Sequence, residues 1–110
     1  MIVRIAEIQV DRSQLEEYLK QARTVGAESV SKEPDVIAIF PMVEKRNPEQ
    51  IRIVEIYKNE EAYKAHLQTP HFLKYKTSTL SMVKKLDLVD MTPFDEQAMP
   101  LIFKKLSAHE

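Results

Sequence analysis

Residues 59–76 read NEEAYKAHLQTPHFLKYK and directly follow an apolar run that is typical of a β-strand. Asn59 is a preferred helix N-cap, and the two glutamates after it lie where the helix dipole favours negative charge. Thr69 and Pro70 interrupt this helix and restart it, with Thr69 as the new cap and Pro70 at the first helical position. The segment therefore predicts a strand followed by a helix in two pieces. Its two histidines and three aromatic residues also make it the main candidate for chemistry.

The flanking segments complete an alternation of strands and helices. Runs rich in β-branched residues indicate strands, and apolar residues at helical spacing indicate the first helix. A short turn containing Asn47 and Pro48 joins the second and third strands, so these two should be antiparallel. We expect an α+β, ferredoxin-like βαββαβ fold with two helices on one face of a four-stranded antiparallel sheet. The expected elements are strands at Ile2–Val10, Asp35–Lys45, Gln50–Lys58 and Lys85–Met91, and helices from Ser13 to about Lys32 and from Asn59 to about Val83.

Four residues carry local expectations within these elements. Ser13 and Glu16 match a capping box at the start of the first helix. Gly26 lies inside that helix, where glycine costs up to about 1 kcal/mol relative to alanine, and this indicates close packing against a neighbour. Pro41 cannot donate a ladder hydrogen bond, so the second strand should lie at a sheet edge or carry a bulge.

The composition is that of one small globular domain. The 110 residues have a net charge of −1, and no basic face suggests a nucleic-acid partner. The absence of cysteine excludes disulfides, thiolate nucleophiles and cysteine-based metal sites. The single glycine excludes glycine-rich phosphate-binding loops. Because the N-terminal apolar run is too short for a signal segment, we expect a cytoplasmic protein with no membrane contact.

Both faces of the predicted sheet carry apolar residues, although two helices can cover only one of them. A bare apolar face of that size is typical of an association surface. We therefore expect a two-fold homodimer with the sheets face to face. Residues 93–110 form an apolar tail beyond the main domain of residues 1–92, and we expect this tail to pack on the domain or on the dimer partner. Alternatively, the tail covers the open face within one chain.

His66 is the leading candidate for proton transfer. It lies on the helical stripe expected to face the sheet, and histidine titrates near neutral pH, so it could act as a general base or acid. Alternatively, it is a buried histidine with one satisfied hydrogen bond. Glu55 has apolar neighbours on the third strand, so it needs either a role in a site or a partner such as Arg4 or Arg52. The aromatic residues that could line a pocket for a flat substrate, or simply form core, are Tyr57, Tyr63, Phe72 and Tyr75.

His71 follows His66 by five residues, which is roughly 140° around a helix, and the break at Pro70 disturbs this spacing further. The pair lacks the i, i+4 spacing of a helical zinc site, and no HExxH motif accompanies it. We therefore expect no metal, and we expect His71 to be exposed or hydrogen-bonded locally.

The third strand and the following helix resemble the antibiotic biosynthesis monooxygenase family. Members typically show a strand ending in Glu-x-aromatic, an acidic helix start, and a histidine followed closely by a second histidine and an aromatic residue. The resemblance extends over about residues 1–92, although many members carry tryptophan in place of Tyr57. The matching elements are Glu55-Ile56-Tyr57, Asn59-Glu60-Glu61-Ala62, His66 and Thr69-Pro70-His71-Phe72.

The resemblance implies a dimeric α/β barrel and a cofactor-independent monooxygenase that oxidises a quinol or polycyclic phenol with dioxygen. It implies that His66 handles a proton and that Glu55 helps to orient the substrate. Two alternatives stay open: an isomerase of a small phosphorylated hydroxy-dione of the autoinducer-2 type, and a non-catalytic dimer that binds a small ligand. Haem-degrading relatives fit poorly, since their functional asparagine, tryptophan and histidine correspond to Ile8, His66 and Lys76. The predicted substrate-binding residues are Tyr57, Tyr63, His71, Phe72 and Tyr75.

Overall fold

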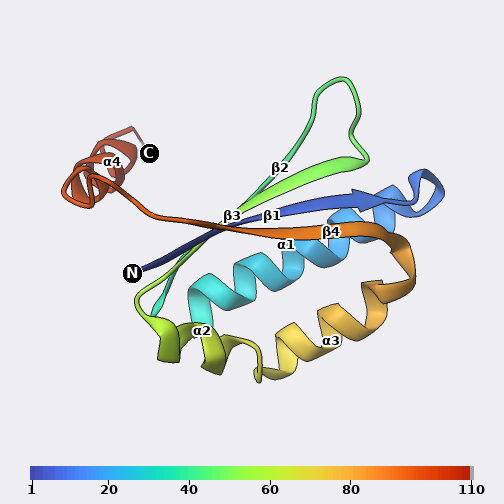
Figure 1. Ribbon diagram of the computed structural model, residues 1–110, viewed down its shortest axis with the longest axis horizontal. Helices are drawn as coiled ribbons and strands as arrows, with labels where there is room; N and C mark the ends of the chain where they lie inside the picture. Colours follow the sequence, from blue (N-terminus) through green and yellow to red (C-terminus); the bar gives the residue numbers. More distant parts are fainter. Residues whose placement is uncertain (110) are drawn as a thin grey trace.

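The computed structural model describes residues 1–109 of the chain. The strands are β1 (Ile2–Val10), β2 (Val36–Val43), β3 (Gln50–Tyr57) and β4 (Val83–Met91); the α-helices are α1 (Leu15–Lys32), α2 (Glu60–His66), α3 (Pro70–Thr79) and α4 (Ala98–Ser107); and the short 3-10 helices are η1 (Arg12–Gln14) and η2 (Leu80–Met82). The strands form one antiparallel sheet in the order β2–β3–β1–β4. Helices α1, α2 and α3 lie on one face of the sheet, and α4 stands apart beyond β4 (Figure 1). This is the ferredoxin-like α+β fold that the order of elements predicts.

The apolar core lies between the sheet and α1. Tyr18, Ala22 and Gly26 are buried on one face of α1 at helical spacing. A Cβ atom added at Gly26 would lie 3.5 Å from the Ile39 side chain, so the glycine packs closely against β2, as its place in the helix predicts. The strands contribute the buried residues Ala6, Ile8, Val10, Ile51 and Ile53.

Two predicted helix boundaries are wrong. The first helical segment does not start with the capping box, because Asp11 accepts hydrogen bonds from the backbone N–H of Ser13 at 2.9 Å and from its hydroxyl at 2.7 Å. These bonds begin η1, and α1 follows at Leu15. The last helical segment ends at Thr79, so Val83 begins β4 instead of closing the helix.

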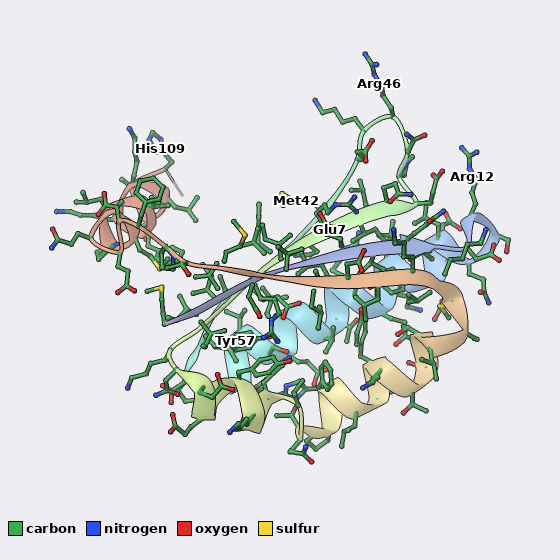
Figure 2. The ribbon with its side chains drawn as sticks, viewed as in Figure 1. Glu7, Arg12, Met42, Arg46, Tyr57 and His109 are labelled. Atoms are coloured by element: carbon green, nitrogen blue, oxygen red, sulfur yellow. The ribbon has the colours of Figure 1, made fainter. Side chains whose placement is uncertain are left out.

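β2 lies at the edge of the sheet, as Pro41 predicts. Its pairing with β3 is irregular between Val36 and Ala38 and regular at the proline. Successive residues of each strand alternate between the helix-covered face and the open face. Figure 2 shows Tyr57 on the helix side of the sheet and Met42 on the open side.

The open face of the sheet is apolar at one end and polar at the other. Two rows of paired residues cross all four strands at the apolar end: Phe40–Val54–Ile5–Val89 and Ala38–Ile56–Val3–Met91. The next row contains Arg52 and Glu7, whose Nε and Oε2 atoms lie 3.5 Å apart. We call the two apolar rows the open-face patch.

The tail does not cover the open-face patch within the chain. No residue of α4 is buried. Phe40, at the edge of the patch, remains 62% exposed. Where the tail packs, on its own domain or on a partner, stays a prediction. None of the helices in residues 1–109 has the length and apolar character that a membrane span requires.

Candidate functional site

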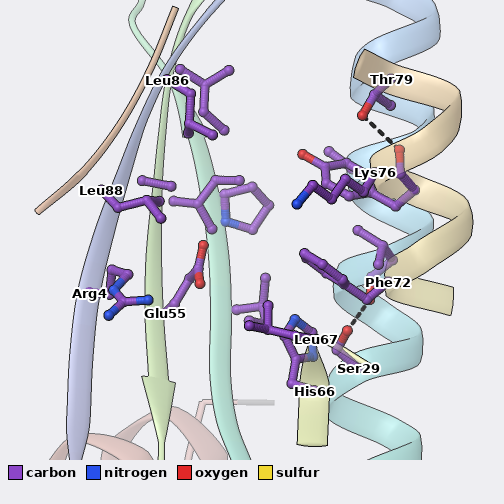
Figure 3. A pocket seen from close by; sticks show the side chains of 18 of the residues that line it. Arg4, Ser29, Glu55, His66, Leu67, Phe72, Lys76, Thr79, Leu86 and Leu88 are labelled. Carbon is purple, nitrogen blue, oxygen red and sulfur yellow. Dashed lines mark hydrogen bonds between the residues drawn. The ribbon is translucent and has the colours of Figure 1, made fainter. Parts of the chain in front are cut away.

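A cavity of about 280 Å³ lies between the sheet and the helices. Its wall is mostly apolar and includes residues of all four strands together with α1, α2 and α3. Figure 3 shows Arg4, Glu55, Leu86 and Leu88 on the sheet side, facing the helices. Six of the seven predicted site residues line this cavity: Glu55, Tyr57, Tyr63, His66, Phe72 and Tyr75.

Glu55 projects from β3 into the cavity (Figure 3). The hydroxyl of Tyr57, two residues along the same face, donates a 2.7 Å hydrogen bond to Glu55 Oε1. Burial raises the pKa of the Glu55 carboxyl, while the Tyr57 hydrogen bond and the nearby His66 and Arg4 oppose this rise. Burial, with the Glu55 carboxylate beside it, also raises the pKa of Tyr57. Glu55 is therefore a carboxyl group that can hold or release a proton inside an apolar cavity.

Neither arginine predicted as a partner forms a salt bridge with Glu55. Arg4 lies opposite Glu55 in the pairing of β1 with β3, but its Nε donates to Asp90 Oδ1 at 2.8 Å. The guanidinium of Arg4 also lies over the Tyr63 ring, 4.3 Å from its centre. Arg52 belongs to the open face. Within residues 1–109, Glu55 has no salt bridge, so the Tyr57 hydroxyl is its principal stabilising contact.

His66 ends α2 and is only 4% exposed. Thr69 holds the chain at this point, because its hydroxyl donates to the His66 carbonyl at 2.8 Å and accepts from the Phe72 N–H at 3.3 Å. Thr69 thus caps α3, as predicted, and also fixes the end of α2. The imidazole lies beside the rings of Tyr57 and Phe72, at centroid distances of 5.4 and 5.0 Å. The break between the two helices therefore brings His66 to the cavity wall.

Glu33 is the main residue that sequence reasoning missed. Its Oε2 atom lies 2.9 Å from His66 Nδ1 and 2.6 Å from His71 Nε2. Glu33 follows the last turn of α1 with an extended backbone, φ −107° and ψ 104°, because the residue before a proline disfavours the helical conformation. The sequence did contain an indication of this contact. An acidic residue at a helix C-terminus interacts unfavourably with the helix dipole, which suggests that Glu33 has a stabilising partner elsewhere.

His71 does not lie where its spacing suggests. Its side chain is 9% exposed, and its hydrogen-bond partner Glu33 is 38 residues away, so the expectation of an exposed or locally bonded histidine is wrong. His71 does not line the main cavity and instead borders a smaller one of about 50 Å³. Tertiary packing places His71 beside Glu33, because α3 packs against α1 and so brings its first turn to the end of that helix.

Glu33, His66 and His71 also have the ligand types that hold zinc, with one ligand atom from each lying within 4.8 Å of the others. Two ligands of a tetrahedral zinc ion lie about 3.3 Å apart, given zinc bonds of about 2.0–2.1 Å. The contacts of 2.6 and 2.9 Å to Glu33 are shorter and have the lengths of hydrogen bonds. The cluster is therefore hydrogen-bonded as it stands.

Two further polar groups of the cavity come from α3. Lys76 lies one helical turn after Phe72 and extends into the cavity (Figure 3). No salt bridge to Lys76 occurs in the part of the chain that the structure describes. The hydroxyl of Tyr75 hydrogen-bonds that of Tyr18 on α1, and burial raises the pKa of Tyr75. The i, i+4 spacing of Phe72 and Lys76 was the signal that could have placed the lysine at the site.

Comparison with known proteins identifies the family. The sequence profile described as antibiotic biosynthesis monooxygenase matches residues 1–78. A candidate antibiotic biosynthesis monooxygenase from Bacteroides thetaiotaomicron is 42% identical in sequence. Its structure matches with a TM-score of 0.84, over 86% of this chain and 90% of that chain. A candidate monooxygenase from Lactobacillus acidophilus is 26% identical with a TM-score of 0.81, and the match covers 83% of this chain but only 43% of that longer one.

A more distant structure confirms the fold. A candidate antibiotic biosynthesis monooxygenase from Nitrosomonas europaea is 20% identical, with a TM-score of 0.81 over 86% of this chain and 100% of that chain. A comparison with curated proteins gave no match. The family profile and the 42% identical structure support a monooxygenase-type function. The chain belongs to the antibiotic biosynthesis monooxygenase family.

Proposed function

We propose that this protein is a cofactor-independent monooxygenase that oxidises a quinol or a polycyclic phenol with dioxygen. One observation carries the proposal: His66 and the buried acid Glu55 line one apolar cavity between the helices and the sheet. Its volume of about 280 Å³ lies near the lower end of small-molecule sites, which suits a compact fused-ring substrate. We further propose that the enzyme acts as a homodimer in the cytoplasm.

In the proposed reaction, His66 removes a proton from the bound substrate. The resulting electron-rich carbanion reacts with dioxygen, and one oxygen atom enters the substrate while the other leaves as water. The substrate itself supplies the electrons, so no added cofactor is needed. A histidine suits this step because it can accept a proton near neutral pH.

The remaining cavity residues support binding of a flat aromatic substrate. Tyr57, Tyr63, Phe72 and Tyr75 line the wall, and rings of this kind favour edge-to-face or offset contacts with an aromatic ligand. Glu55 is placed to accept or donate a hydrogen bond to a substrate hydroxyl or carbonyl oxygen. The mostly apolar wall also limits the number of polar groups that could reprotonate a carbanion.

The test is oxygen consumption with anthrone and 1,4-naphthohydroquinone, corrected for uncatalysed oxidation. We expect His66→Ala to lower kcat/KM by about 10²–10⁴-fold, which is the usual contribution of a general base. Lys20→Ala is the control, since it truncates an exposed side chain of α1 that does not line the cavity. Wild-type oxygen uptake by folded His66→Ala, as judged by far-ultraviolet circular dichroism, would show that the proposed role of His66 is wrong.

A second candidate function is isomerisation of a small phosphorylated hydroxy-dione. The observation that favours it is the presence of two cationic side chains, Arg4 and Lys76, on the cavity wall. Thermal shift with dihydroxyacetone phosphate and with dihydroxyacetone separates the two functions, because a bound ligand raises Tm. Stabilisation by the phosphorylated ketone alone would favour the isomerase. Stabilisation by a phenol without oxygen uptake would favour a ligand-binding role.

A further inference from the structure

Three secondary-structure elements converge on one carboxylate oxygen behind the cavity. Glu33 comes from the end of α1, His66 from the end of α2 and His71 from the first turn of α3. Both imidazoles contact the same atom, Glu33 Oε2, and the three side chains are only 14%, 6% and 9% exposed. Of the three, only His66 lines the main cavity. Glu33 therefore contacts His66 from outside the wall of the cavity.

The chemistry of the contact decides which nitrogen of His66 carries the proton. An ionised carboxylate has only acceptors, so Nδ1 of His66 must donate its proton to Glu33. In a neutral imidazole the other nitrogen is then an acceptor. The two ring nitrogens point in different directions, so the Nε2 lone pair is directed away from Glu33.

We propose that Glu33 is a positioning residue, which holds His66 in the Nδ1–H tautomer and stabilises the imidazolium that forms when Nε2 takes the substrate proton. This inference rests on the proposed function, in which His66 is the base. The same division of labour, an acid that orients a histidine and a histidine that moves the proton, recurs among unrelated catalytic sites. Glu33 does not touch the substrate in this arrangement.

His71 has a supporting part in the same arrangement. Its Nε2 atom lies 2.6 Å from the same oxygen, Glu33 Oε2, and an ionised carboxylate accepts a hydrogen bond from a protonated Nε2. Two donors on one oxygen fix the orientation of the carboxylate, so Glu33 cannot turn away from His66. This accounts for a second histidine close to the cavity that is not part of its wall.

The test begins with the protein alone. Nitrogen-15 NMR of the histidine side chains at neutral pH should show His66 with its proton on Nδ1. We expect Glu33→Ala to produce a mixture of tautomers. Glu33→Gln keeps an oxygen acceptor without the charge, so it should retain the Nδ1–H tautomer. Glu16→Gln, an exposed position on α1, is the matched control for the loss of one carboxylate. Finding the wild-type His66 proton on Nε2 would overturn the proposal.

Turnover of anthrone supplies the second readout. Glu33→Gln should lower kcat by about 10–100-fold with KM changed less than about threefold, because the charge acts on the imidazolium and not on substrate binding. An unchanged kcat in folded Glu33→Gln would overturn the proposal that the charge of Glu33 stabilises the His66 imidazolium. If wild type shows no turnover, the oxygenase proposal fails, whereas the tautomer experiment still decides the role of Glu33.

A metal titration separates the hydrogen-bonded cluster from a zinc site. Addition of Zn²⁺ to wild type, followed by calorimetry, should give no stoichiometric binding that depends on Glu33. One zinc ion bound per chain in wild type and lost in Glu33→Gln would overturn the proposal, because the three side chains would then be metal ligands.

Discussion

At the scale of single residues, the cavity holds an acid whose pKa the surrounding protein raises. Glu55 has apolar neighbours and a single direct stabilising contact, the 2.7 Å hydrogen bond from Tyr57. Burial is the main cause of the raised pKa of Glu55, so the fold favours the neutral carboxyl. Buried carboxyl groups with a raised pKa are common in sites that hold and transfer protons.

Replacing Glu55 by glutamine should make the protein more stable at neutral pH. The raised pKa of Glu55 means that its neutral form stabilises the fold below the ordinary value of 4.5, and that this stabilisation is lost as pH rises through the raised pKa. Glutamine keeps the shape and an oxygen that can accept from Tyr57, but it never ionises. We expect Tm of Glu55→Gln to exceed that of wild type by a few °C at pH 8.

The difference should shrink as the pH falls, because wild-type Glu55 is then protonated in both the folded and the unfolded chain. Thermal melts from pH 4 to pH 8 measure it. Glu16→Gln, at an exposed position, provides the baseline for loss of one carboxylate. A Glu55→Gln protein that is less stable than wild type at pH 8 would contradict the prediction, because the fold would then stabilise the ionised carboxylate of Glu55.

The residues of the site were predictable to different degrees. His66 and Glu55 stand next to a helix break and in an apolar strand, and these local signals are readable from sequence. The link from Glu33 to His66 is not, because it spans 33 residues and depends on how α1 packs against the helices after β3. The position of His71 was mispredicted for the same reason. Helical spacing describes neighbours on one helix and not contacts between helices.

At the scale of elements, two prolines shape the site. Pro34 forces Glu33 out of the helical conformation at the end of α1, and Pro70 begins α3 directly after the turn that follows His66. Each break turns a side chain that would otherwise lie along a helix toward the junction of α1, α2 and α3. The site is therefore built from helix ends, where backbone direction changes within one or two residues.

Most elements were readable from sequence because their signals are local. The edge position of β2 follows from Pro41, and the start of α3 from Thr69 and its proline. The end of α3 was placed too late, because Leu80 and Val83 continue a helical spacing of apolar residues although the chain turns into η2 and β4. Period alone does not distinguish a helix end from a strand start when both carry apolar residues.

Gly26 tests the packing of α1 on the sheet. An alanine Cβ at this position would meet Ile39 at 3.5 Å, an ordinary van der Waals distance. Glycine inside a helix costs about 0.5–1 kcal/mol relative to alanine, so Gly26→Ala should raise the free energy of unfolding by roughly that amount. Urea denaturation followed by circular dichroism measures the change.

The larger side chain of valine gives the opposite expectation at the same position. Gly26→Val should destabilise the protein by about 1–3 kcal/mol, since its extra methyl groups must displace Ile39 or the helix. A destabilised Gly26→Ala protein would mean that α1 and β2 lie closer together than the 3.5 Å contact indicates.

At the scale of the whole molecule, helices cover one face of the sheet, and the other face is open and partly apolar. The open-face patch crosses all four strands, whereas the adjacent row contains the Arg52–Glu7 pair. Exposed apolar patches of this kind mark association sites in soluble proteins. We propose that the patch is the homodimer interface, with the two sheets face to face about a two-fold axis.

The apolar tail belongs to the same proposal. β4 ends at Met91 in the open-face patch, and α4 extends from this end of the sheet (Figure 1). Its exposed apolar residues are Leu101, Ile102, Phe103 and Leu106. An apolar helix with no buried residue in its own protomer gains stability from a second surface. We therefore propose that residues 93–110 pack on the partner and enlarge the interface.

Sedimentation velocity at micromolar concentration tests both parts of the proposal. Wild type should sediment as a dimer. Phe40→Glu should give mainly monomer, because the exposed side chain of Phe40 tolerates a charge in one chain whereas a buried interface does not. Leu73→Asp, at an exposed position on α3 outside the patch, should remain dimeric.

Removal of residues 93–110 should leave the domain folded and raise the dimer dissociation constant at least tenfold, since the tail contributes apolar area to the partner. A monomeric wild type would refute the dimer. A tail-deleted chain that dimerises as tightly as wild type would refute the packing proposed for α4 while leaving the sheet interface intact.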